Sequence, residues 1–277
     1  MSLLMVEIVN VSNEVLTFPM DESANYFIAD ITGLDPVKAE IVESDYGTID
    51  GTQYQSSRRG SRNPVLTIGY NPDYGINTVA TLRQNIYSKI MTKAAVTIKL
   101  HTDFTDPLHP LEISGRVESI ETPMFTRDPE CKISITCQDP DFVIPEPVVI
   151  NTSVAHNTPE LIVNYSGTSE VGFVAKFTIN RNIPAFNLIH RTGNYIVTNF
   201  EYNDTLQIGD VLEISTVPGN KGAWVTRAGL RYSVLYHVSK ISGWAKLVPG
   251  NNYFQTLFSE GSAQPVQFVY QRKYGGL

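Results

Sequence analysis

Alternating apolar and polar positions predict a chain built mainly from β-strands. In Val65–Tyr70, for example, Leu66, Ile68 and Tyr70 alternate with the residues between them, as in a half-buried strand. Similar runs predict strands in the first half at Leu4–Val11, Tyr26–Thr32, Ala39–Glu43, Ala95–His101, Leu111–Ile120 and Cys131–Cys137. In the second half they predict strands at Leu161–Tyr165, Gly172–Asn180, Asn187–His190, Asn194–Asn199, Asp210–Thr216, Ala223–Arg227, Trp244–Leu247 and Val266–Tyr270. Turn signals separate these at the spacing of a β-sandwich.

One segment, Thr78–Met91, has the pattern of an amphipathic helix instead. Its apolar residues fall at i, i+3, i+7 and i+11, on one stripe: Val79, Leu82, Ile86 and Ile90. Asn77 or Thr78 can cap its first turn. We expect this single helix to cover one face of a sheet rather than to act as a recognition helix.

A long polar excursion, Tyr46–Pro64, precedes the strand Val65–Tyr70. It contains a turn signal at Asp50-Gly51 and a basic cluster formed by Arg58, Arg59 and Arg62. One interpretation is a solvated loop, and the other is an extended β-arm that packs against another copy of the chain. The three arginines suit a subunit interface better than a nucleic-acid site, because no aromatic residue lies among them.

A proline-rich segment divides the chain. Pro140, Pro145 and Pro147 withhold backbone donors and favour a stiff, extended path. We therefore expect an N-terminal domain over residues 1–139, a linker over 140–147 and a C-terminal β-sandwich over 148–277. The segment Ser233–Ser242 is apolar enough to be buried, but its pattern does not distinguish strand from helix.

Several short motifs occur in a particular order along the chain. They are Gly33-Leu34-Asp35-Pro36, Asp50-Gly51, a loop ending in Arg62-Asn63, Leu247-Val248-Pro249-Gly250-Asn251-Asn252, a last strand near Val266–Tyr270, and a basic-aromatic finish at Arg272 and Tyr274. In the order and spacing of these motifs, the chain resembles the distal tail proteins of siphophages. The resemblance implies a split-barrel-like or sandwich-like N-terminal domain with one helix and a hairpin arm, followed by a galectin-like jelly roll. It also implies a ring of six copies at the tail tip of the virion, assembled in the host cytoplasm.

Charge, cysteine spacing and hydropathy exclude several classes of protein. Charged residues make up 18% of the chain, and the formal net charge is −7. The negative charge argues against a protein that binds DNA tightly through contacts to its phosphates. Cys131 and Cys137 are separated by roughly 20 Å of extended chain, which is beyond disulfide reach, so we expect both to be small hydrophobic residues. The first residues lack the basic region of a signal peptide, and no apolar run has the length of a membrane span.

Candidate chemistry is sparse. His101, Asp103, Asp106 and His109 could be considered as metal ligands, but their turn-rich context favours a polar loop, and we expect no metal or cofactor. Asp139 and Asp141 are interpreted as linker charges rather than a catalytic pair. Trp224 and Trp244 are candidates for stacking on a sugar, although the core is the favoured place for both.

These observations favour a structural protein over an enzyme. By resemblance, its ring would join the tail tube to the baseplate or tip and leave a channel through which DNA passes without specific binding. The implied partners are the tail tube protein, the tail-associated hub protein and receptor-binding proteins, with no membrane contact. The alternative is a carbohydrate-binding module that contacts the host cell wall.

Overall fold

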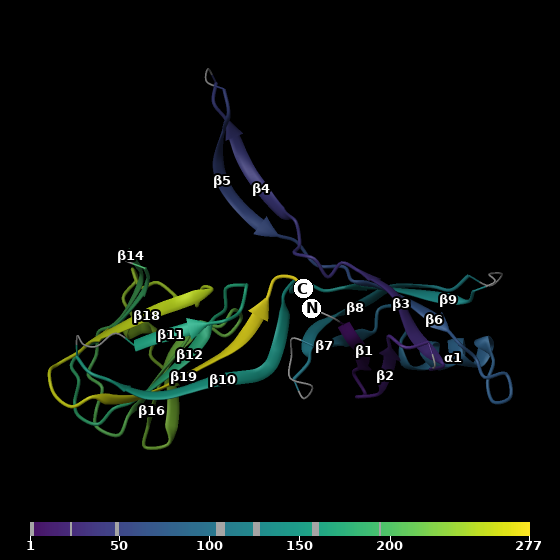
Figure 1. The fold of residues 1–277 in the computed structure, drawn as a ribbon. Coiled ribbons are helices and arrows are strands. Elements are labelled where there is room, and N and C mark those ends of the chain that lie inside the picture. Colours follow the sequence, from purple (N-terminus) through teal and green to yellow (C-terminus); the bar gives the residue numbers. More distant parts are fainter. Residues whose placement is uncertain are drawn as a thin grey trace. The chain divides into compact units, whose positions relative to one another are not determined.

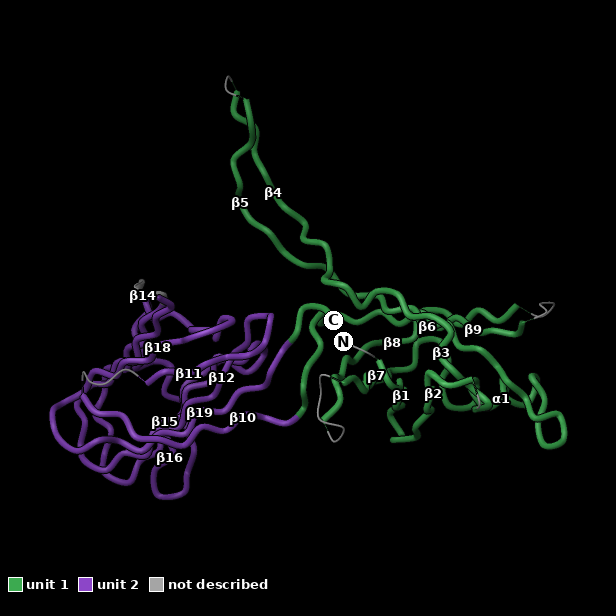
Figure 2. Tube along the Cα trace, viewed as in Figure 1, with its two compact units in different colours: residues 1–145, 274–277 green, residues 146–273 purple. Residues whose placement is uncertain are grey.

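The chain folds into two compact units (Figure 2). The computed structural model describes residues 3–22, 24–47, 50–103, 109–123, 128–156, 161–193 and 195–277. Unit 1 comprises Met1–Pro145 together with Tyr274–Leu277, and unit 2 comprises Glu146–Lys273. The last four residues, which the sequence places in the second domain, are thus grouped with the first. That the two domains fold independently stays a prediction.

The body of unit 1 is an antiparallel sheet in the order β2-β1-β7-β8-β9-β6-β3 (Figure 1). Its strands are β1 Leu3–Asn10, β2 Val15–Pro19, β3 Tyr26–Thr32, β6 Val65–Tyr70, β7 Ala95–Thr102, β8 Leu111–Glu121 and β9 Glu130–Thr136. The rings of Phe18 on β2 and Tyr26 on β3 lie 5.9 Å apart, so the two end strands of this sheet approach one another. This curved sheet agrees with the mainly β, split-barrel-like fold expected from the sequence.

The predicted helix is present as α1, Val79–Lys89. The hydroxyl of Thr78 caps it by accepting from the Thr81 amide, and Thr81 in turn accepts from the Thr78 amide. The apolar stripe faces inward: Leu82, Ile86 and Ile90 are buried in the core of unit 1. The sequence therefore predicted both the helix and the face that it buries.

The polar excursion forms a two-stranded hairpin. Strands β4, Ala39–Asp45, and β5, Thr52–Arg59, pair with each other and form a small sheet of their own (Figure 1). The strand predicted at Ala39–Glu43 is confirmed as part of β4, but it is the first strand of the hairpin and does not lie outside it. We call residues 39–59 the hairpin.

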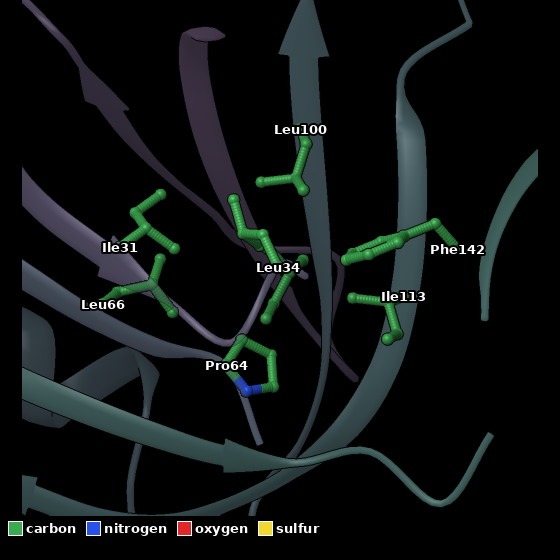
Figure 3. A pocket seen from close by; sticks show the side chains of 8 residues that line it. Ile31, Leu34, Pro64, Leu66, Leu100, Ile113 and Phe142 are labelled. Atoms are coloured by element: carbon green, nitrogen blue, oxygen red, sulfur yellow. The ribbon is translucent and has the colours of Figure 1, made fainter. Parts of the chain in front are cut away.

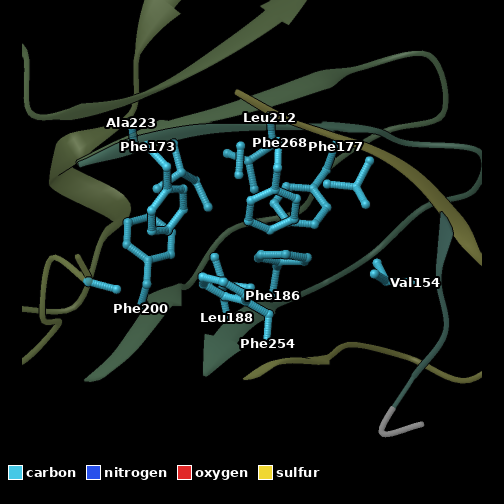
Figure 4. Packing of buried hydrophobic residues seen from close by; sticks show 14 of the residues in the cluster. Val154, Phe173, Phe177, Phe186, Leu188, Phe200, Leu212, Ala223, Phe254 and Phe268 are labelled. Atoms are coloured by element: carbon cyan, nitrogen blue, oxygen red, sulfur yellow. The ribbon is translucent and has the colours of Figure 1, made fainter. Parts of the chain in front are cut away.

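Unit 2 is a sandwich of two antiparallel sheets, in the orders β17-β16-β15-β12-β19-β10 and β11-β18-β13-β14. Its elements are β10 Phe142–Val154, β11 Leu161–Tyr165, β12 Phe173–Thr178, β13 Phe186–Thr192, β14 Tyr195–Tyr202, β15 Val211–Ser215, β16 Gly222–Arg227, β17 Leu230–Ser233, the 3-10 helix η1 Leu235–His237, β18 Gly250–Leu257 and β19 Gln264–Tyr274. Aromatic rings fill the space between the sheets (Figure 4), with Phe173 on one sheet 5.2 Å from Phe254 on the other.

Several local predictions differ from the structure. Residues 140–147 are extended, as expected, but Phe142 and Ile144 are buried in the core of unit 1 instead of lying in an open linker. Trp244–Leu247 is not a strand, since only Leu247 makes an isolated bridge, to Val171. No strand was predicted at β2, β17 or β18, nor over the part of β10 that follows residue 147, whereas β5 lies in the segment expected to form the hairpin arm. Asp106, Pro107 and Asn194 lie outside the described residues.

No helix in the described ranges is long and apolar enough to cross a membrane. Cys131 and Cys137 are free thiols without solvent exposure, as their interpretation as hydrophobic residues requires.

Candidate assembly surface: the hairpin and its base

Every residue of β4 and β5 is exposed, including large apolar side chains. Residues that alternate along a strand, and their cross-strand partners, share a face. With the register shift between Val42 and Glu43, the first face carries Ile41 and Tyr54, which are 58% and 61% exposed. A hydrogen bond of 2.8 Å between the hydroxyls of Tyr54 and Ser57 agrees with this assignment. Apolar side chains are thus presented to solvent on strands that nothing else in the described chain covers.

The opposite face of the hairpin is more polar. There, Arg58 donates to Glu40 across the strands at 2.7 Å, and both side chains are mostly exposed. Such a surface ion pair contributes little, because water competes for both charges. A two-stranded hairpin is at best marginally stable alone in water. Its order must therefore come from its base or from a partner.

Arg59 anchors the hairpin through a bidentate ion pair with Asp141. The distances from Nη1 and Nη2 to the two carboxylate oxygens are 2.6 and 2.9 Å. The carboxylate is only 7% exposed, whereas the arginine is 37% exposed. Asp141 was predicted to be a linker charge with no specific role, and that was wrong, because its carboxylate is buried beneath the end of β5 and pairs with Arg59.

Arg62 was grouped with the two other arginines as an interface residue, but its side chain is 1% exposed. Its guanidinium lies 4.5 Å from the ring centre of Phe142 and donates to main-chain carbonyls of unit 1. Those carbonyls belong to Gly33, Leu34, Asp35, Pro140 and Gly275. Burial lowers the pKa of Arg62, while the negative charge of Asp141 opposes the shift. Arg62 is therefore part of the hairpin's foundation and not of its exposed surface.

Apolar contacts hold the two chain segments that lead into and out of the hairpin. Leu34 before it and Pro64 after it point into a cluster with Leu66, Ile113 and Phe142 (Figure 3). These side chains leave no space for a water molecule. The close packing fixes the spacing of the two segments, since dense interiors resist displacement.

Gly33 makes this geometry feasible. It has a φ of +82°, and a Cβ at this position would lie 2.4 Å from the Asn63 carbonyl oxygen. Sequence reasoning used Gly33 only as part of a resemblance, and it missed Asp141 as a partner of Arg59. The available signal was the motif Gly33-Leu34-Asp35-Pro36, whose first three carbonyls all accept from Arg62.

The remaining candidates lie elsewhere. Asp50 and Gly51 are exposed at the turn of the hairpin, where Gly51 has a φ of +107°. In unit 2, Trp244 is half-buried against the core, with its ring 5.7 Å from that of Phe200. Trp224 is half-buried on the outer face of β16, and the guanidinium of Arg231 covers one face of its ring at 4.1 Å. The ring face that Arg231 occupies is not open to a sugar.

The described residues bring together no group of three or more His, Cys, Asp and Glu side chains that could hold a metal ion. Of the four candidates, Asp106 lies outside the described residues, and His101 sits 3.3 Å from Glu7 on the neighbouring strand β1.

The fold of this chain, in which a curved sheet with helix α1 and an exposed hairpin is joined to a β-sandwich, matches that of a solved phage protein. The chain is similar in structure to the Dit protein (gp 19.1) of phage SPP1, which is described as a paradigm of the hub adsorption apparatus in phages that infect Gram-positive bacteria. The match has a TM-score of 0.67 at 13% identity and covers 97% of this chain and 98% of that one. The fold is therefore Dit-like, as the sequence resemblance predicted.

A chain of the phage P2 baseplate in its activated, calcium-containing conformation also matches, at 10% identity over 100% of both chains, with a TM-score of 0.42. No family model matches the sequence, and neither does any curated protein.

Proposed function

We propose that this chain is a structural protein of a phage tail tip, in which unit 1 assembles with further copies into a ring. The ring joins the tail tube to the baseplate or tip and leaves a channel for DNA. By analogy with the distal tail proteins that the sequence resembles, it contains six copies. Unit 2 is available to other tail components, such as hub and receptor-binding proteins. The Dit-like fold supports this role, and the virion tail tip is the corresponding location.

The observation that carries the proposal is the hairpin. It presents Ile41 and Tyr54 to solvent on one face, yet its base is built from a bidentate ion pair and a dry apolar cluster. Ordering each backbone residue costs about 1–2 kcal/mol, which exposed strands do not recover on their own. A neighbouring copy that covers the first face would offset this cost by burying apolar surface, at about 25 cal/mol per Å².

The test removes the hairpin without disturbing its base. Residues 41–57 are deleted, and Glu40 and Arg58, which face each other in the register, are joined by a short Gly-Ser turn. This variant keeps Arg59 and Arg62. We expect it to remain folded and monodisperse, whereas the intact chain forms rings that are visible in negative-stain images and by mass photometry.

Point variants sharpen the test. Ile41→Ser and Tyr54→Ser, on the first face, should weaken assembly more than Val42→Ser, on the opposite face, although Val42 is similarly exposed at 51%. Full rings from the deletion variant would refute the role of the hairpin. An intact chain that stays monomeric and binds cell-wall polysaccharide would instead favour the carbohydrate-binding alternative.

A further inference from the structure

Arg62 joins three parts of unit 1 that are distant in the sequence. Its Nη1 donates to the carbonyls of Gly33, Leu34 and Asp35, each at 2.8 Å, in the segment that leads into the hairpin. Its Nε donates at 2.6 Å to Pro140, just before the chain leaves for unit 2. Its Nη2 donates to Gly275, just after the chain has returned.

The backbone of Arg62 adds a fixed point to this junction. Its amide donates to the Cys137 carbonyl at 2.9 Å, and the Cys137 amide donates back at 2.8 Å. Arg62 is 1% exposed, so its donors rely on these protein partners rather than on water in the folded state. A guanidinium has five N–H donors in a rigid fork, whereas an ammonium has three on a flexible stem, so lysine cannot reproduce the set.

Residues 275–277, which we call the returning segment because they follow the chain's return from unit 2, contact the hairpin base at more than one point. The Leu277 amide donates to the Leu34 carbonyl at 3.2 Å. A Cβ at Gly276 would lie 2.5 Å from Cδ of Pro36, so this segment lies flush against the turn before the hairpin. Residues 275–277 therefore form one wall of the hairpin base, although they are more than 200 positions away in the sequence from Arg62 and Leu34.

We propose that Arg62 is the positioning residue of the hairpin and that residues 275–277 complete its base. The two connections to unit 2 and the foot of the hairpin then open as one cooperative element. Loosening the returning segment frees the hairpin while leaving both hydrophobic cores folded. The consequence for ring assembly rests on the proposed function, but the coupling between the returning segment and the hairpin base does not.

Hydrogen exchange of the full-length protein, read by mass spectrometry, tests this coupling. The variants are Arg62→Lys, Gly276→Val and a deletion of residues 275–277, with Arg58→Lys as the matched control, because Arg58 is exposed on the hairpin itself. We expect the amides of Arg62 and Cys137 to exchange roughly tenfold faster in the first three variants, the size expected for losing about one net hydrogen bond that opposes local opening. Arg58→Lys should match the wild type.

Two readouts keep the result interpretable. Exchange of the β7 and β8 amides reports whether the core of unit 1 is intact, and fluorescence of Trp224 and Trp244 reports unit 2. Unchanged exchange at Arg62 and Cys137 after deletion of residues 275–277 would overturn the proposal, even if Arg62→Lys unfolds unit 1. Ring assembly is scored separately: a wild-type chain that never forms rings refutes the proposed function and leaves the exchange result decisive for the coupling.

Discussion

Replacing Asp141 with asparagine should destabilise unit 1 by about 2 kcal/mol, intermediate between the cost for a buried ion pair and that for an exposed one. The side chain keeps its size but loses its charge, and the bidentate contact with Arg59 at 2.6 and 2.9 Å is broken. Breaking a fully buried pair costs about 3–5 kcal/mol, and an exposed pair contributes about 0–1 kcal/mol. Asp141 is 7% exposed and Arg59 is 37% exposed. When the ion pair is broken, water can therefore solvate the arginine in part but not the buried side chain at position 141, which places the cost between the two limits.

The positions of the tryptophans determine the assay. Trp224 and Trp244 both lie in unit 2, so tryptophan fluorescence does not report the unfolding of unit 1. Calorimetry, with hydrogen exchange of the unit 1 core, measures the affected transition, while fluorescence should show unit 2 unchanged. Glu40→Gln is the control, because it removes the acid from the exposed pair with Arg58.

We expect the control to change stability by less than about 0.5 kcal/mol, as is usual for surface substitutions. Equal effects of Asp141→Asn and Glu40→Gln would refute the reasoning, because the burial of Asp141 would then have no energetic consequence.

Three further predictions concern the stability of the two units. His190 is fully buried, with Nε2 3.0 Å from Oδ1 of Asn252, and burial lowers its pKa in the folded protein. An unfolded histidine has a pKa of about 6.5, so below that pH the unfolded state binds more protons than the folded state. Denaturation followed by fluorescence should therefore show unit 2 losing stability from about pH 6.5 downward, and His190→Gln should flatten that dependence. Trp244→Ala should cost about 2–4 kcal/mol because the ring packs on the core, whereas Trp224→Ala should cost about 1 kcal/mol; equal costs in denaturation curves would contradict this ranking. The two units should give separate calorimetric transitions, and a single transition in which the two units unfold together would contradict their independence.

The sequence by itself determined the elements that have one buried face. Alternation located β6, β7 and β9, and the 3.6-residue period located α1 and its inward stripe, because each pattern mirrors burial against a core. Asn77 and Thr78 were both recognisable as possible caps, because cap preference is set by the first turn alone, and the structure shows that Thr78 is the cap. The proline-rich segment likewise showed where the chain is extended, because proline restricts the backbone locally.

Only the tertiary structure separated the roles of the three arginines. Strand β5 has no buried face, so its sequence carries no alternation that could have predicted it. Arg58 and Arg62 occur in the same polar run, yet one is exposed and the other is buried beneath carbonyls of residues 78 and 213 positions away. Nothing local distinguishes them, because the burial of a charge depends on which distant segments supply its partners. The fold brings Pro140 and Gly275 to the same guanidinium, and that contact makes Arg62 part of the hairpin's base.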